Sequence, residues 1–254
     1  ELEQSEADQK KGITPSVYER IKTCLDRFES GDSDAWWELC REMTIEDASK
    51  YYGDELNSDL ISQPGWKVCD KFLKERIVKA GKKYILENDA NTGHWLGKDI
   101  SHRPATAGYK AFMMLNKLEP VFLNNLSTDR WEKWASIIIA YLEIGAVTGE
   151  DEPFLEITKQ AYQEAPQEVI DTLLILINKE NEKDNGKGNI LFALRKVENC
   201  LDKRLQDALL DKAKDASLKP SCFQDLLSYL LRADNQEAKS YAESLLTLPL
   251  DKNS

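Results

Sequence analysis

The residues of this chain that could do chemistry gather in one stretch, residues 91–108, which contains both histidines of the sequence, His94 and His102. A loop could bring the two imidazoles together, and Asp99 or Glu87 could orient one of them, as in a general acid–base pair. A metal ion would need a third ligand, and the spacing supplies none. No G-x-S-x-G, H-E-x-x-H or paired-cysteine motif is present. We therefore expect no catalytic residue, no metal ligand and no cofactor.

The same stretch offers a better case for recognition than for catalysis. Residues on loops carry binding more often than residues of the core do. The candidate partner-binding residues are His94, Trp95, Lys98, His102 and Arg103. The alternative is structural: Trp95 fills a gap between helices, His102 caps a helix, and Arg103 pairs with a neighbouring carboxylate.

Two pairs of adjacent aromatic residues, Trp36–Trp37 and Tyr51–Tyr52, are secondary candidates. Neighbouring residues on a helix point in different directions, so we expect one ring of each pair to face the core and the other to face solvent. One ring of each pair would then be available for contact, and packing is the alternative for both pairs.

The composition excludes several classes of function. The chain has 254 residues and a net charge of -11, which argues against non-specific binding to nucleic acid or to anionic lipid. Six lysines between residues 67 and 83 form a basic stripe, but neighbouring acidic residues dilute it, and we expect a solvated face. No apolar run approaches the roughly 20 residues that span a bilayer. A neutral or basic protein partner, or a flanking domain of the same chain, fits this charge better.

The five cysteines are odd in number and widely spaced. Most fall beside other apolar residues at helical spacing, which is typical of buried free thiols. Together with the absence of a signal-peptide core, this predicts a reducing, cytoplasmic setting. The cysteines are Cys24, Cys40, Cys69, Cys200 and Cys222.

Hydrophobic periodicity predicts helices along almost the whole chain, with short connections and no strand pattern. A helix begins near Thr14–Pro15 and ends at Gly31. Pro64 opens a long helix that runs to about residue 87, and Pro104 starts another. Further helices are expected at about residues 36–43, 45–52, 131–144, 154–164, 166–181, 190–197, 202–215, 220–231 and 235–248.

Many successive helix pairs, each with one apolar face, favour an all-α fold, namely an α-solenoid of HEAT-like antiparallel helix pairs. A compact, irregular helical domain is the alternative. We divide the chain into a linker remnant at residues 1–12, an N-terminal helical part at 13–90, a long loop at 91–108, HEAT-like repeats at 109–248 and a tail at 249–254.

Three segments, residues 76–88, 103–143 and 160–181, carry packing motifs such as Ala107-Gly108-Tyr109 and Trp131-x-x-Trp134-Ala135. They resemble the HEAT-like helical region that follows the ATPase module in some large bacterial NACHT/STAND-type NTPases. The resemblance implies a non-catalytic sensor or scaffold arm, in some members coupled to anti-phage defence. Two alternatives stay open: a purely structural spacer between domains, and, more remotely, a small metal-dependent or histidine-based hydrolase.

Overall fold

Every regular element that the computed structural model describes is helical, which confirms the all-α prediction for those residues. The described residues are 14–46, 51–98, 100–141, 153–183 and 190–247. None of their helices is long and apolar enough to cross a lipid bilayer. The helices are α2 (Val17–Glu29), α3 (Ala35–Glu42), α4 (Pro64–Val68), α5 (Lys71–Glu87), η1 (Thr92–His94), α6 (Arg103–Leu118), α7 (Pro120–Asn124), α8 (Thr128–Ala140), α9 (Pro153–Glu164), α10 (Pro166–Glu182), α11 (Ile190–Lys196), η2 (Glu198–Cys200), α12 (Lys203–Ala213), α13 (Pro220–Arg232) and α14 (Gln236–Leu246).

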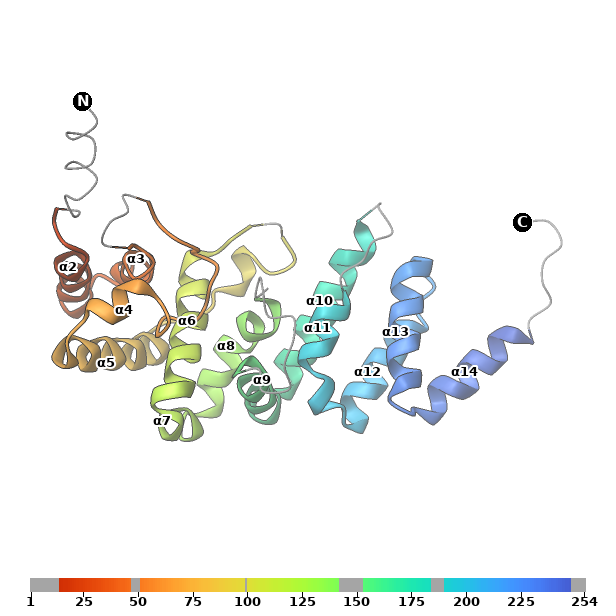
Figure 1. The fold of residues 1–254 in the computed structure, drawn as a ribbon. Coiled ribbons are helices and arrows are strands. Elements are labelled where there is room, and N and C mark those ends of the chain that lie inside the picture. Colours follow the sequence, from red (N-terminus) through yellow and green to blue (C-terminus); the bar gives the residue numbers. More distant parts are fainter. Residues whose placement is uncertain (1–13, 47–50, 99, 142–152, 184–189, 248–254) are drawn as a thin grey trace, which may run out of the picture.

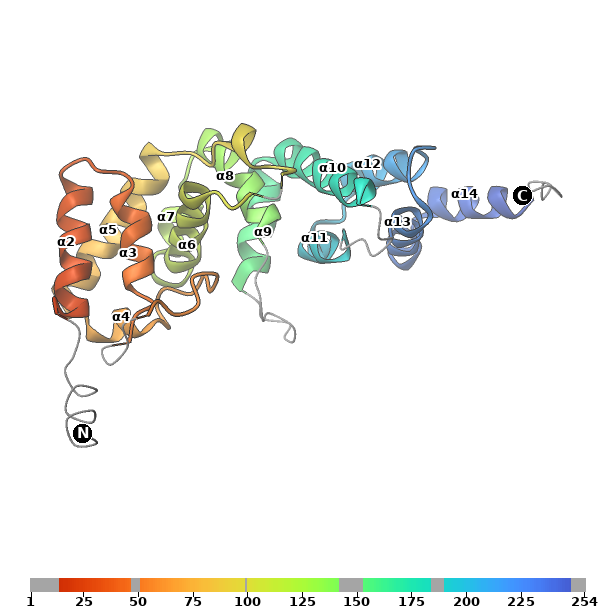
Figure 2. The same cartoon turned by 90° about the horizontal axis from the view of Figure 1, so that it is seen from above.

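The helices follow one another along an elongated molecule, with α2 at one end and α14 at the other (Figure 1). They pack as successive pairs, α2 with α3, α5 with α6, α8 with α9, α10 with α11, and α12 with α13. Neighbouring pairs also touch, so that α3, α6, α9, α11 and α13 form one continuous row. The other row contains α2, α5, α8, α10 and α12, and the view from above separates the two rows along much of the molecule (Figure 2).

A chain of buried aromatic rings connects the first helices of both rows. The Trp36 and Tyr84 ring centroids lie 5.9 Å apart, and those of Tyr84 and Trp134 lie 6.0 Å apart. Two indole N–H groups find backbone acceptors: Trp36 Nε1 donates to the Ala107 carbonyl at 3.0 Å, and Trp134 Nε1 donates to the Ile85 carbonyl at 3.1 Å. These contacts therefore fasten α3 to α6 and α8 to α5. We call this set, with Phe28, Phe112 and Trp131 at its ends, the aromatic chain.

Gly108 lets α6 approach the Trp134 ring. A Cβ atom at Gly108 would lie 1.9 Å from the nearest carbon of that ring, which is far inside van der Waals contact. The residue has no unusual backbone conformation, so the requirement is for space alone. The packing of the aromatic chain therefore requires glycine at position 108 of α6 as well as the aromatic rings themselves.

Two buried lysines tie separate elements together. Lys196 of α11 donates to the carbonyls of Ile138 at 3.0 Å and Tyr141 at 2.5 Å, and so satisfies the C-terminal end of α8. Lys110 of α6 donates to the Asn57 carbonyl at 2.7 Å and holds the connection between α3 and α4 against α6. Burial lowers the pKa of Lys110 below its ordinary value. Each buried amine thus finds its partner in a backbone carbonyl of another element.

Two predicted elements have different bounds in the structure. The helix expected from Pro64 onward is interrupted between Val68 and Lys71, because the Asp70 side chain accepts the Leu73 N–H at 2.7 Å and caps a new helix there. The loop predicted at 91–108 is too long: residues 103–108 form the first turns of α6.

Other sequence predictions meet the structure only in part. The helix expected at 45–52 is absent at both of its described ends, and residues 47–50 lie outside the described part of the chain. The helix expected at 131–144 ends at Ala140, and residues 142–152 also lie outside it. The five cysteines are buried and free, as predicted.

Substitution of Gly108 by alanine should destabilise the protein, because the new methyl group would overlap the Trp134 ring. We expect a loss at or above the upper end of the about 1–3 kcal/mol that is typical of overpacking, measured as the free energy of unfolding in denaturant. Gly93→Ala is the matched control, since its Cβ would meet nothing within 4 Å. Equal unfolding midpoints for the two variants would contradict this account of α6 packing.

Candidate functional site

A pocket of about 330 Å³ lies between α3 and the N-terminal turn of α6. Its size falls at the lower end of the range for small-ligand sites, about 300–1,000 Å³. Three aromatic rings, three carboxylates and two guanidinium groups line it, together with one serine and one proline. These residues are Trp37, Tyr52, Tyr84, Asp34, Glu38, Glu42, Arg41, Arg103, Ser33 and Pro104.

Helical spacing places one wall of the pocket. Asp34, Glu38 and Arg41 follow one another at steps of four and three residues, so they share a face of α3. The opposite wall begins at Arg103, the first residue of α6. Its position is fixed from two sides, since Tyr84 donates its hydroxyl to the Pro104 carbonyl at 3.0 Å and the aromatic chain holds α6 against α3 one turn later.

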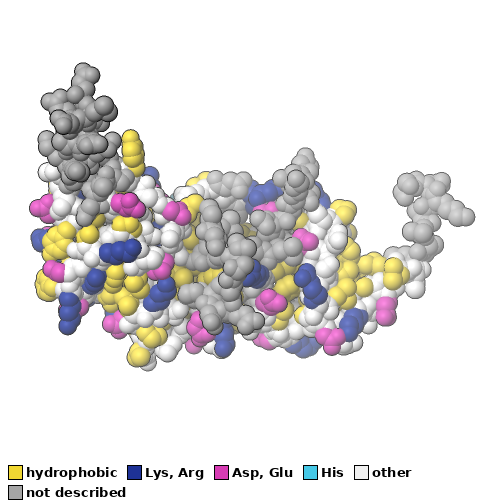
Figure 3. Space-filling model, in the orientation of Figure 1, with side chains coloured by type: hydrophobic (Ala, Val, Ile, Leu, Met, Phe, Trp, Pro, Cys, Tyr) yellow, Lys and Arg dark blue, Asp and Glu magenta, His cyan; other side chains and the backbone are white. Residues whose placement is uncertain are grey.

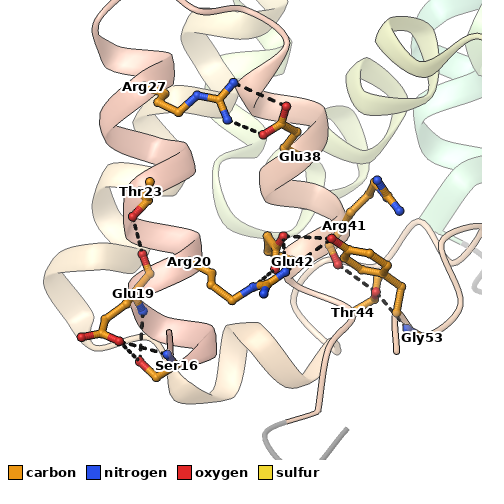
Figure 4. A network of polar contacts seen from close by, with 11 residues as sticks. Ser16, Glu19, Arg20, Thr23, Arg27, Glu38, Arg41, Glu42, Thr44 and Gly53 are labelled. Carbon is orange, nitrogen blue, oxygen red and sulfur yellow. Dashed lines mark hydrogen bonds and ion pairs between the residues drawn. The ribbon is translucent and has the colours of Figure 1, made fainter. Parts of the chain in front are cut away.

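Most charges around the pocket already have partners. Glu38 pairs with Arg27 of α2, and Glu42 accepts from Arg20 Nε at 2.5 Å; Figure 4 shows both ion pairs between α2 and α3. Arg41 pairs with Glu55 at 3.1 Å. These charged groups therefore hold together α2, α3 and the segment that connects α3 to α4.

Arg41 makes a second contact, with the ring of Tyr52. The guanidinium carbon lies 4.1 Å from the centroid of the Tyr52 ring, within the range of a cation–π interaction. The Tyr52 hydroxyl donates to Glu42 at 3.1 Å. Burial, and then the charge of Glu42, raise the pKa of Tyr52. Arg41 thus has both its ion-pair partner and its aromatic partner within the protein.

Two charged residues of the pocket have no such partner. Asp34 occupies the N-cap position of α3, but its side chain accepts no capping hydrogen bond. Arg103 is also exposed, and neither side chain makes a hydrogen bond or ion pair with any residue in the described part of the chain. One carboxylate and one guanidinium therefore line the same pocket from α3 and α6 without touching.

Trp37 provides an aromatic wall next to these charges. Its Nε1 atom is buried and has no acceptor among the described residues. Because this atom is screened from solvent, a molecule in the pocket meets the ring of Trp37 and not its N–H group. The side chain is therefore an apolar surface for a ligand.

Of the five residues predicted to contact a partner, only Arg103 lines the pocket. Trp95 is only 7% exposed, and its Nε1 donates to the Ala90 carbonyl at 2.6 Å. The ring packs in the core, which is the structural alternative. Lys98 is exposed and donates to the Gly93 carbonyl at 2.7 Å, which closes the segment on itself.

The two histidines lie close together in the same segment. The centroids of the His94 and His102 rings are 6.4 Å apart and the rings are nearly parallel, at 15°. His102 Nδ1 accepts the Ala105 N–H at 3.3 Å and so caps α6. Asp99, the third group of the acid–base hypothesis, lies outside the described residues. Among the described residues, no three His, Cys, Asp or Glu side chains are placed to share a metal ion.

Of the two secondary aromatic pairs, the tryptophans follow the prediction of one buried and one exposed ring, and the tyrosines do not. Trp36 is buried and Trp37 is partly exposed, as expected for neighbours on a helix. The prediction for the tyrosines is wrong, since Tyr51 is 82% exposed and Tyr52 is 37% exposed. No helix forms at these two residues, so helical alternation does not apply to them.

Asp34 is a pocket residue that the sequence analysis did not single out. An aspartate at the N-cap of a helix usually accepts a backbone N–H, and only the structure shows that this carboxylate makes no capping bond. Glu38, Arg41 and Tyr84 were not singled out by any motif, because their proximity to Arg103 arises from packing between helices distant in sequence.

Comparison with known proteins supplies no precedent for the pocket. No family model, curated protein or solved structure matches the chain. Its chemistry has to be derived from its own side chains.

Burial, and then the neighbouring His94, lower the pKa of His102 below its ordinary value of 6.5. The folded chain therefore binds this proton more weakly than the unfolded chain does. The contribution of His102 to stability should be complete above about pH 6.5 and should be lost as the pH falls through the lowered folded-state pKa.

We expect His102→Asn, which keeps a side-chain acceptor but does not titrate, to lose less stability than the unchanged chain between about pH 7.5 and about pH 5. Denaturant unfolding across this interval measures the difference. Parallel pH profiles for the two proteins would show that the cap does not titrate in this range.

Proposed function

We propose that the chain is a non-catalytic α-solenoid of HEAT-like antiparallel helix pairs, which acts as a protein-binding or ligand-sensing arm of a larger bacterial NACHT/STAND-type signalling or defence NTPase in the cytoplasm. The paired and row-wise packing of the helices supports the solenoid. In such an architecture each pair buries its apolar face against its neighbours, and recognition is left to the side chains that remain outside the packing.

The observation that carries the binding role is the pair of unpartnered charges, Asp34 and Arg103, in one pocket. The surrounding charges are committed to ion pairs within the protein, whereas these two exposed charges have no partner among the described residues. Exposed groups of opposite sign beside an aromatic wall are suited to a partner that carries complementary polar groups.

The charge of the chain supports a protein or small-molecule partner over nucleic acid or membrane. The net charge is -11. On the face in Figure 3, Lys and Arg side chains are interspersed with Asp and Glu side chains and with apolar patches. Binding to phosphate backbones or anionic lipid rests on concentrated positive charge, which this face does not offer.

The two histidines support a structural role more than a catalytic one. One ring nitrogen of His102 already accepts the Ala105 N–H, and protonation of that nitrogen would remove the cap.

A spacer between domains is the second candidate, and the burial of Trp95 favours it, because the segment most suited to recognition is partly used for packing. The spacer predicts that no partner depends on the pocket.

Capture of proteins from bacterial lysate by the immobilised chain separates the two candidates. We expect the retained amount of at least one protein to fall about tenfold or more with Arg103→Ala and with Asp34→Ala. An ion-paired contact worth about 1.4 kcal/mol changes affinity tenfold. Asp34→Ala removes no capping bond, so it should leave the stability of α3 nearly unchanged.

Lys71→Ala is the matched control, an exposed cation of α5 outside the pocket lining. A set of captured proteins that responds equally to all three variants, or to none of them, would contradict the binding role and leave the spacer.

A further inference from the structure

We propose that the pocket between α3 and α6 receives the carboxylate end of an α-amino-acid unit, with the carboxylate on Arg103 and the nearest N–H donor of the ligand on Asp34. The inference deepens the proposed function and rests on it, because it names the ligand chemistry of the same pocket. The shared group occurs both in free amino acids and in the C-terminal residue of a polypeptide.

Arg103 is the group that selects a carboxylate. A guanidinium offers a planar fork of N–H donors that matches the two oxygens of a carboxylate. In this pocket the fork of Arg103 is unoccupied by any described residue, whereas Arg41 is held by Glu55 and by the Tyr52 ring. A carboxylate that enters therefore finds one available cation.

Asp34 sets the second requirement. Its carboxylate accepts hydrogen bonds only, so the ligand must bring a donor to the opposite wall. A simple anion would satisfy Arg103 but would face the charges of Asp34 and Glu38, and a simple cation would be repelled by Arg103. A ligand with a carboxylate and a nearby N–H group satisfies both walls at once.

The size and the aromatic wall limit how much of the ligand enters. A pocket of about 330 Å³ accepts a terminal residue and not a folded surface. The exposed face of Trp37 is placed to pack against the side chain of that residue, since its N–H is screened from solvent. The α-amino-acid unit thus combines the required charge pattern with a side chain that can cover the ring.

The direct test uses a pool of randomised hexapeptides with free C-terminal carboxylates, the same pool with C-terminal amides, and the standard free amino acids. Each is applied to the immobilised protein, and retention is compared by mass spectrometry. We expect free-carboxylate peptides or free amino acids to be retained about tenfold better than the amidated pool. Arg103→Gln should abolish this preference, and Lys71→Gln, at an exposed cation of α5 outside the pocket lining, should keep it.

The source of the ligand follows from which probe is retained. Selective retention of free-carboxylate peptides assigns a polypeptide C-terminus, and retention of free amino acids alone assigns a small molecule; both support the inference. Asp34→Asn should weaken retention in either case, because the acceptor charge is lost.

Equal retention of the free and amidated pools, a preference that survives Arg103→Gln, or no retention of any probe would overturn the inference. Its failure is distinguishable from failure of the proposed function. If capture of lysate proteins depends on Arg103 while the two peptide pools behave alike, the pocket binds its partner through another group, and only the ligand chemistry is wrong.

Discussion

The aromatic chain is the contact on which the N-terminal half of this molecule depends. Trp36, Tyr84 and Trp134 come from α3, α5 and α8, and the centroids of neighbouring rings lie 5.9 and 6.0 Å apart. The indole N–H groups of the two tryptophans donate to backbone carbonyls of neighbouring helices. The rings therefore fix the orientation of these helices through hydrogen bonds, in addition to burying apolar surface. Gly108 provides the space for this arrangement, and a side chain there would separate α6 from α8.

The same contact creates the pocket. Tyr84 belongs to the aromatic chain through its ring and to the pocket through its hydroxyl, which holds the Pro104 carbonyl. Trp36 fixes α3 against α6, and its neighbour Trp37 lines the pocket. Asp34 and Arg103 are therefore presented by two helices whose separation is set in the core. A site on rigid helices can keep two opposite charges apart, which a flexible loop would allow to pair.

The sequence predicted the helices well because apolar periodicity, proline at helix starts and glycine at helix ends act locally. It missed the break after Val68, because the signal there is a single capping side chain, Asp70, inside an apolar pattern that continues across it. It left open whether Trp95 contacts a partner or fills a gap between helices, and the hydrogen-bond partner of this ring lies only five residues away in the chain. The pocket could not be predicted, since it joins residues from four segments of the chain whose proximity is set by packing.

The central claim is that Asp34 and Arg103 are held in one pocket without pairing, and a double-mutant cycle tests it directly. The free energy of unfolding is measured for Asp34→Asn, Arg103→Gln, the double variant and the unchanged chain. Independent sites add within about 0.3–0.5 kcal/mol, and we predict additivity within that limit. A coupling of about 1 kcal/mol or more would show that the two side chains pair with each other in solution, and the pocket would then have no unpartnered charges to offer a ligand.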